Sequence, residues 1–307
     1  MVEKGVPILL LSGPQGTGKS TFARAIAYAC VVRANFPVVS FCFTPNHPQL
    51  SDLHRVIPTL ACQMQKTNLP GLKETIEASI ADPFIWSRPL SKQFIELIVR
   101  PIRASINSGA HNHLIFVILL DGIDACNDYG ALKQFLSDIK TNIADEVYYD
   151  RIKILCTSRD VPNVQAAFRS LINYYRHIST HPSAKNNVLK YLNDSTGDVR
   201  QRTESPWDLI NNYIAEKSEC SFDIATTMLQ RVRAANTYNA ADIQAIIEQT
   251  ATQRPSTFNS FNEPRRRDIQ SFTDMSPLTN TSPLDILLKI LRNKRVRCGQ
   301  DTSSFTR

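Results

Sequence analysis

Five short apolar stretches occur in the first 180 residues, and longer amphipathic segments separate them. Each stretch is four to seven residues long, and apolar and polar positions do not alternate cleanly within it. Such runs are typical of parallel strands buried on both faces of a sheet. The expected strands are Ile8 to Leu11, Val38 to Phe43, Leu114 to Leu120, Lys153 to Thr157 and Tyr174 to Ile178.

Apolar residues recur at helical spacing in the segments between these strands. Helices are expected at Thr21 to Val31, Leu53 to Gln65, Ser91 to Ile106 and Tyr129 to Ile143. Because strand and helix alternate, the pattern predicts an α/β fold with a parallel sheet flanked by helices. We assign residues 1–183 to this domain.

The strand pattern stops beyond residue 183. Residues 184–250 carry several short helical patterns, and we expect a small helical C-terminal domain there. Residues 251–307 are rich in Ser, Thr, Asn, Pro and Arg. That composition predicts a polar, basic linker or tail with one short amphipathic helix, Pro283 to Leu291.

The stretch SGPQGTGKST lies between the first strand and the first helix, and it matches the Walker A pattern GxxxxGK[ST]. Glycines let the backbone wrap a phosphate chain with its N–H groups inward, and the helix adds the positive end of its dipole. Lys19 is expected to reach the β- and γ-phosphates. A purely structural glycine turn is the competing interpretation, and the flanking strand and helix disfavour it. The predicted nucleotide-binding residues are Gly13, Pro14, Gln15, Gly16, Thr17, Gly18, Lys19, Ser20 and Thr21.

Two aspartates follow the buried strand in LIFVILLDGIDAC. Asp121 stands at the strand end, where P-loop proteins place the acid that holds Mg²⁺. The hydroxyl of Ser20 is a second Mg²⁺ ligand, so Ser20 and Asp121 are the predicted metal residues. Both aspartates could instead cap the following helix. Asp124 is therefore either a water-polarising acid or a cap.

The stretch ILCTSR ends another buried strand in polar residues. In an open parallel sheet, ligands bind beyond the carboxyl ends of the strands. Arg159 is accordingly either a sensor of the γ-phosphate or an ordinary surface arginine. Asp124 and Arg159 are the candidate catalytic residues.

Taken together, GPQGTGKST, LLDGIDAC and ILCTSR resemble the NACHT class of signal-transducing (STAND) P-loop NTPases, in particular its fungal nephrocystin-3-like branch. VVSFCF and HRVIPTLACQM also match, and the resemblance covers Ile8 to Phe168. It implies an additional-strand sheet, with the sensor strand between the phosphate-loop and magnesium strands. It also implies ATP or GTP bound with Mg²⁺, slow hydrolysis, and nucleotide control of oligomerisation or of binding to signalling proteins. In the same way it supports the roles given above to Asp121, Asp124 and Arg159.

The sequence departs from this family at two places. Ala125 follows Asp124, where the family usually has a second acid, and this loss is expected to slow turnover more than binding. The aromatic strand is followed by Thr44 and Pro45, where the family has an arginine or lysine.

Three other functions compete with a hydrolysing switch. Ala125 keeps open a hydrolysis-deficient scaffold that uses nucleotide as a structural ligand. A P-loop small-molecule kinase would need an arginine-rich lid, which the sequence lacks between its strands. A small GTPase would need the N-K-x-D motif, which is also missing. None of this selects ATP over GTP.

Composition narrows the partners. The 307-residue chain has a net charge of +7, and residues 251–307 hold ten Lys/Arg against five Asp/Glu. The rest is nearly neutral, which argues against specific nucleic-acid binding. Apolar runs are too short to span a membrane, and the N-terminus does not resemble a signal peptide. Seven singly spaced cysteines predict a reducing, cytoplasmic location, and His111 and His113 are interpreted as loop residues rather than metal ligands.

Overall fold

The computed structural model describes residues 6–108, 114–143, 151–171, 174–180, 184–196, 207–219, 221–235 and 239–252. Five parallel strands form one sheet in the order β2-β3-β4-β1-β5. The strands are β1 (Ile8–Ser12), β2 (Val38–Cys42), β3 (Phe116–Asp121), β4 (Ile152–Ser158) and β5 (Tyr175–Ser179). All five expected strands are present, and no end is displaced by more than two residues.

Burial along the strands explains their apolar runs. The central strands β1, β3 and β4 are buried over their whole length, whereas the edge strands β2 and β5 are partly exposed. Successive residues of a strand point to opposite faces, so each central strand supplies two cores. Leu119 and Leu155 face helix α1 (Lys19–Ala34), and Ile118 and Ile154 face the opposite layer.

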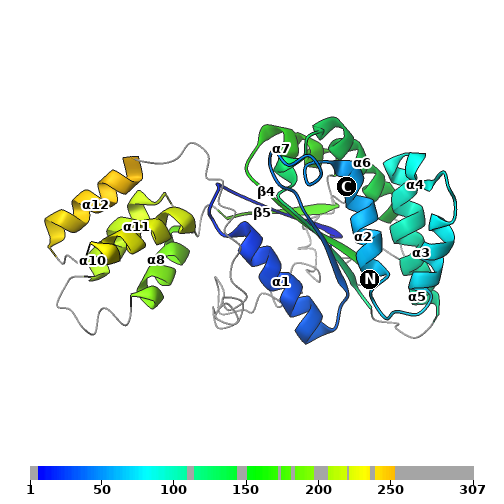
Figure 1. Cartoon of the computed structure of the whole chain (residues 1–307), viewed down its shortest axis with the longest axis horizontal. Coiled ribbons are helices and arrows are strands. Elements are labelled where there is room, and N and C mark those ends of the chain that lie inside the picture. The colour runs from blue at the N-terminus through cyan, green and yellow to red at the C-terminus, as the bar shows by residue number, and fades with distance from the viewer. Residues whose placement is uncertain are drawn as a thin grey trace, which may run out of the picture.

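Most helices cover that opposite face, as Figure 1 shows with α1 on one side of the sheet and α2, α6 and α7 on the other. These helices are α2 (Val56–Met64), α3 (Leu72–Ile80), α4 (Leu90–Phe94), α5 (Arg100–Asn107), α6 (Tyr129–Ile143) and α7 (Pro162–Arg169). Short 3₁₀ turns are η1 (Leu53–Arg55), η2 (Ile85–Ser87) and η4 (Ile123–Ala125). Helices α3 and α7 were not among the expected helices, because each is only two turns long.

The helix expected at Ser91 to Ile106 is instead broken into three parts. Between α4 and α5 lies η3 (Ile95–Val99), a π-helical turn. Pro101 has no backbone N–H to donate to the preceding turn, so a regular α-helical ladder cannot continue there. The N–H of Arg100 donates five residues back, to the Ile95 carbonyl, which closes the wider turn.

Beyond the sheet, the described residues contain four further helices, which lie together beyond the loop at the end of β1 (Figure 1). They are α8 (Ala184–Ser195), α10 (Trp207–Lys217), α11 (Phe222–Ala234) and α12 (Ala240–Thr252). Their apolar faces form a core of their own around Trp207, Ile214 and Met228. Helix α12 includes the first two residues of the predicted tail, whereas residues 253–307 with the predicted short helix, and also His111 and His113, lie outside the described residues.

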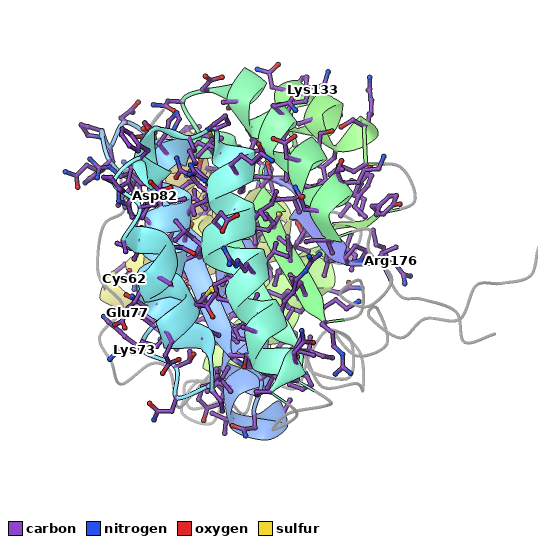
Figure 2. All side chains as sticks on the ribbon, turned by 90° about the vertical axis from the view of Figure 1, so that its right-hand side faces the viewer. Cys62, Lys73, Glu77, Asp82, Lys133 and Arg176 are labelled. Atoms are coloured by element: carbon purple, nitrogen blue, oxygen red, sulfur yellow. The ribbon has the colours of Figure 1, made fainter. Side chains whose placement is uncertain are left out.

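Surface and buried positions divide as their chemistry predicts. Lys73 and Glu77 lie one turn apart on α3 (Figure 2), with 3.8 Å between Nζ and Oε1. Such an exposed pair contributes little to stability. Cys62 is exposed on α2, whereas the thiols of Cys30 and Cys156 are buried. Across the part of the chain that the structure describes, no helix is long and apolar enough to cross a membrane.

Candidate functional site

The glycine-rich loop joins β1 to α1 at the carboxyl edge of the sheet. Gly16 and Gly18 have φ angles of 77° and 81°, a region that L side chains rarely adopt. A Cβ at Gly16 would also lie 2.1 Å from the hydroxyl of Ser221, so position 16 needs glycine on both counts. Of the other predicted loop residues, Gln15 and Thr21 are exposed.

Lys19 folds over this loop. Its Nζ donates to the carbonyls of Gly13 at 2.8 Å and Pro14 at 2.6 Å. Burial lowers the pKa of Lys19, and the charges of Asp124 and Asp160 oppose that shift. The ammonium group therefore lies in the loop under the influence of several carboxylates.

Strand β5 supports the loop from the side. The hydroxyls of Thr17 and Thr180 are 2.9 Å apart, and the N–H of Thr180 donates to the Ser12 carbonyl at 2.8 Å. A Cβ at Gly13 would lie 1.9 Å from the Thr180 hydroxyl. Sequence reasoning missed Thr180, although it directly follows the last strand and so had to lie at the same edge.

Ser20 and Asp121 lie side by side. The Ser20 hydroxyl donates to Asp121 Oδ1 at 2.9 Å, which links the start of α1 to the end of β3. The hydroxyl of Thr157, on β4, donates to the same oxygen. Asp121 is only 7% exposed, so these bonds satisfy a largely buried carboxylate.

Asp124 and Arg159 form an ion pair with each other. The Arg159 backbone N–H donates to Asp124 Oδ1 at 2.9 Å, and its Nε donates to Oδ2. Tyr129 fixes the same turn by donating its hydroxyl to the Asp124 carbonyl at 2.5 Å. Neither aspartate of the motif caps α6, because Asp128 accepts the N–H of Ala131 at 2.8 Å there. The capping interpretation is therefore wrong for that helix.

A further polar cluster joins three adjacent strands. The Ser12 hydroxyl donates to Asp160 and lies 2.6 Å from His177 Nε2. Ser12 ends β1, Asp160 follows β4 and His177 lies within β5, and these three strands are neighbours only in the folded sheet. Neither Asp160 nor His177 was singled out from the sequence.

Helix α11 contacts the loop from the helical segment. The N–H of Phe222 donates to the Gly16 carbonyl at 2.8 Å, and its ring lies 3.7 Å from the position of a Cβ on Gly18. Ser221 caps α11 by accepting the Ile224 N–H. Burial raises the pKa of Asp223, and the charge of Lys19 opposes this. No motif marked this contact in the sequence.

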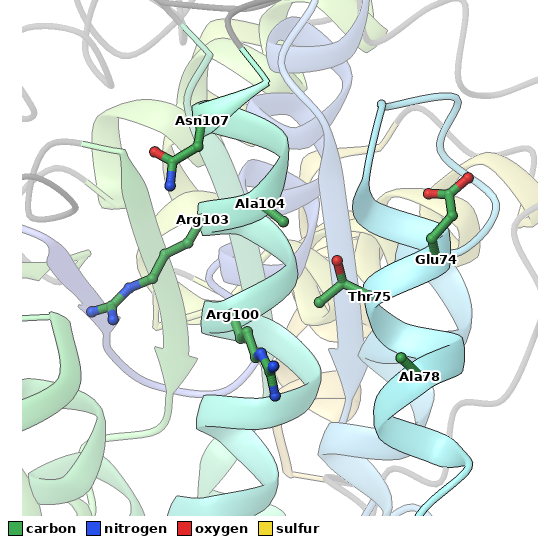
Figure 3. Close-up of a pocket in the computed structure, with 7 residues that line it drawn as sticks. All are labelled: Glu74, Thr75, Ala78, Arg100, Arg103, Ala104 and Asn107. Atoms are coloured by element: carbon green, nitrogen blue, oxygen red, sulfur yellow. The ribbon is translucent and has the colours of Figure 1, made fainter.

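The structure has one hollow at the ends of the strands and another between two helices away from the loop. A cavity of about 420 Å³ at the ends of β2 and β3 has Asp121, Cys42 and Thr44 in its wall. Arg24 of α1 also lines it, so a cation from another element shares this cavity with Thr44 and Pro45. A second hollow of about 520 Å³ lies between α3 and α5 (Figure 3), and none of its lining residues belongs to the loop or a strand end.

The donor set at the loop fits a hard divalent cation. Mg²⁺ prefers oxygen ligands and usually takes one or two protein groups together with phosphate oxygens and waters. The Ser20 hydroxyl and the Asp121 carboxylate are such groups, and they lie 2.9 Å apart. These two residues would hold the ion.

The sheet order, the glycine loop between β1 and α1, and the acid at the end of β3 together define an additional-strand P-loop NTPase fold. Residues 2–159, just over half of the chain, match the family model described as Nephrocystin 3, N-terminal. The chain belongs to this family, which confirms the nephrocystin-3-like part of the resemblance. No curated protein matches the sequence.

Among solved structures, the chain is similar to Cdc6p from Pyrobaculum aerophilum, with a TM-score of 0.45 and 16% identity over 75% of the chain. It is also similar to the ORC2 protein of Aeropyrum pernix in ADPNP–ADP complexes, with a TM-score of 0.46 and 14% identity over 80% of the chain. The chain spans 56% and 62% of the length of these two proteins, respectively. A third similar structure, the FIGL-1 AAA domain in complex with ADP, has a TM-score of 0.36 and 14% identity, with 88% of this chain and 77% of that one covered.

Proposed function

We propose that the chain is a nucleotide-binding switch module of the NACHT type that binds ATP or GTP with Mg²⁺. The observation that carries this proposal is a glycine loop followed by Ser20 in the first turn of α1, whose hydroxyl oxygen lies 2.9 Å from Oδ1 of the strand-end Asp121. Membership of the Nephrocystin 3, N-terminal family supports it.

In this proposal, backbone N–H groups of the loop and the first turn of α1 bind the phosphates. The 16-residue helix α1 presents its positive dipole end there. Lys19 exchanges its bonds to the Gly13 and Pro14 carbonyls for bonds to phosphate oxygens. Because those oxygens are charged, the new bonds are the stronger ones.

Mg²⁺, when bound, neutralises charge on the phosphates. Ser20 and Asp121 are the residues that would hold it, since their oxygen atoms lie together at the sheet edge next to the loop. Arg159, at the end of β4, lies near enough to influence the pKa of Lys19. In the proposed site it faces the terminal phosphate.

One observation favours a second candidate, a scaffold that binds nucleotide without hydrolysing it. Both oxygens of Asp124 accept hydrogen bonds from Arg159, so this carboxylate is engaged rather than free to polarise water. Ala125 supplies no second acid, and the next carboxylate, Asp128, caps α6. For this candidate, we expect the nucleotide to bind tightly while phosphate release is slow or absent.

Control of conformation or assembly is the further part of the proposal. The segment 184–250 is taken as a separate helical domain, and its α11 contacts the phosphate loop at Gly16. A nucleotide that reshapes the loop would therefore act on this segment. Homo-oligomers or signalling proteins are the partners that such a switch would control.

The test is a titration of the purified chain with ATP, GTP and their diphosphates, with and without Mg²⁺, followed by measurement of phosphate release. The wild-type chain is expected to bind a purine triphosphate. Lys19→Ala should weaken binding by about 10- to 100-fold, because each bond between charged partners is worth about 1.5–3 kcal/mol. Tight binding with no phosphate release would select the scaffold.

Lys133→Ala is the matched control. It removes the same charge from an exposed position on α6 (Figure 2) and should leave binding unchanged. A folded wild-type chain without affinity for any purine triphosphate would overturn the proposal.

A further inference from the structure

Thr157 lies on β4, between the loop strand and the strand that carries Asp121. It is 1% exposed, and it stands opposite Leu11 of β1. On the other side, Cys156 pairs with Leu120, so Thr157 lies level with Asp121. A buried hydroxyl at this place needs partners within the protein.

The Thr157 hydroxyl uses both of its bonding directions on one turn. Its oxygen accepts the N–H of Gly122 at 2.8 Å. Its hydrogen therefore points the other way, to Asp121 Oδ1. Gly122 directly follows Asp121 and has a φ of 71°, so a single side chain holds both the turn and the carboxylate before it.

The pleat of the sheet explains this arrangement. Residues two apart along a strand share a face, so Thr157 lies on the face of Leu155, and Asp121 on that of Leu119. Both leucines belong to the core beneath α1, whose first turn contains Ser20. Three polar groups thus gather on the face that α1 covers.

We propose that Thr157 is a positioning residue that orients Asp121 toward Mg²⁺, an inference that rests on the proposed function. Ser20 and Thr157 donate hydrogen bonds to the same carboxylate oxygen, but only Ser20 is also a proposed metal ligand. The Ser20 hydroxyl is itself a metal ligand in the proposed site, so its bond to Asp121 has to change when the ion binds. Thr157 is not a proposed metal ligand, so its bond to the carboxylate can stay in place with and without the ion.

The experiment compares nucleotide affinity in Mg²⁺ and in EDTA for wild type, Thr157→Val and Thr157→Ser. The quantity of interest is the ratio of the two affinities, because it isolates the contribution of the metal. Groups that orient metal ligands typically contribute 10- to 100-fold to metal affinity. Thr157→Val should accordingly reduce the ratio about tenfold, whereas Thr157→Ser, which keeps the hydroxyl, should stay within about twofold of wild type.

Thr196→Val is the matched control. It removes another fully buried threonine hydroxyl, one that donates to the Leu192 carbonyl at 2.8 Å in the helical segment. It should lower the melting temperature and leave the affinity ratio unchanged. Thr157→Ala, tested in the same way, provides a second hydroxyl-free variant where the valine variant does not fold.

The outcomes separate the two proposals. A folded Thr157→Val or Thr157→Ala chain with the wild-type ratio would overturn the role of Thr157 and leave nucleotide binding standing. A wild-type chain without nucleotide binding would overturn the proposed function, and this inference with it. A reduced ratio that Thr157→Ser restores would support the assignment.

Discussion

Asp124 and Arg159 form an ion pair with each other at the end of β4. The Asp124 side chain is 7% exposed and that of Arg159 is 45% exposed, so the pair joins a buried acceptor to a partly solvated donor. The backbone N–H of Arg159 donates to the same carboxylate. Asp124 therefore holds Arg159 in place through both the backbone and the side chain of the arginine.

This pairing predicts coupling between the two positions. We expect Asp124→Asn and Arg159→Met each to lower the free energy of unfolding, and the double variant to lower it by less than the sum. The coupling should be about 1 kcal/mol, because solvent screens a pair with one exposed member. Urea unfolding of the four proteins measures it.

Additive effects of the two substitutions would contradict the pairing. Phosphate release offers a separate comparison in the same proteins. If Asp124 acted directly on water, Asp124→Asn would slow release equally with and without Arg159.

The phosphate loop is an element defined by its neighbours as much as by its own glycines. Thr180 after β5 approaches it at Gly13, and Ser221 before α11 approaches it at Gly16. Both approaches leave no room for a side chain. The loop therefore joins the sheet to the helical segment as well as serving as the candidate phosphate site.

Two glycines allow this contact to be tested. Gly16 and Gly71 have φ angles of 77° and 74°, but a Cβ at Gly71 would meet Ala104 only at an ordinary 3.6 Å. Gly71→Ala should cost about 1 kcal/mol for the left-handed backbone alone. Gly16→Ala should cost more than that, roughly 2 kcal/mol or above, because Ser221 must also move. Thermal or urea unfolding measures both.

A double variant sharpens this comparison. Ser221→Gly removes the obstructing side chain. Because glycine is also a good helix cap, losing the Ser221 cap of α11 should cost only about a few tenths of a kcal/mol in stability. The substitution should therefore recover part of the loss in Gly16→Ala and none in Gly71→Ala. Equal effects of the two alanine substitutions would show that α11 does not restrain the loop.

At the scale of the whole molecule, the sheet separates two cores and the helices beyond it form a third. Buried cysteines occur in both cores beside the sheet, so their reactivity can be used to test whether these cores are closed to solvent. Cys30 is on α1 and belongs to the core between α1 and the sheet, whereas Cys156 is on β4 and belongs to the core on the opposite face, and both are 0% exposed. Burial raises the pKa of Cys30 to about 11 and that of Cys156 to about 12.

Alkylation should follow this division. Only the thiolate reacts, so at pH 8 the exposed Cys62 is expected to react with iodoacetamide, while Cys30 and Cys156 react only after unfolding. Peptide mass spectrometry before and after urea treatment measures each site. Modification of Cys156 as fast as that of Cys62 would contradict the described core.

The sequence alone determined the strands, the α/β class and the place of the loop and Asp121. These features are local, because burial on both faces requires a continuous apolar run and a phosphate loop requires glycines at a fixed spacing. Helix α6 was also predicted to the residue. The weak points were α3 and α7, which are short, and the π-helical turn before Pro101.

Only the tertiary structure decided which residues meet at the sheet edge. Thr157 contacts Asp121 across 36 positions, and Thr180 contacts Thr17 across 163. Hydrophobic periodicity reports that a strand is buried, but it does not report which strand lies beside it. Strand order and the docking of α11 are set by packing between distant segments, and this packing placed Thr157 beside Asp121, and Thr180 and Ser221 against the loop.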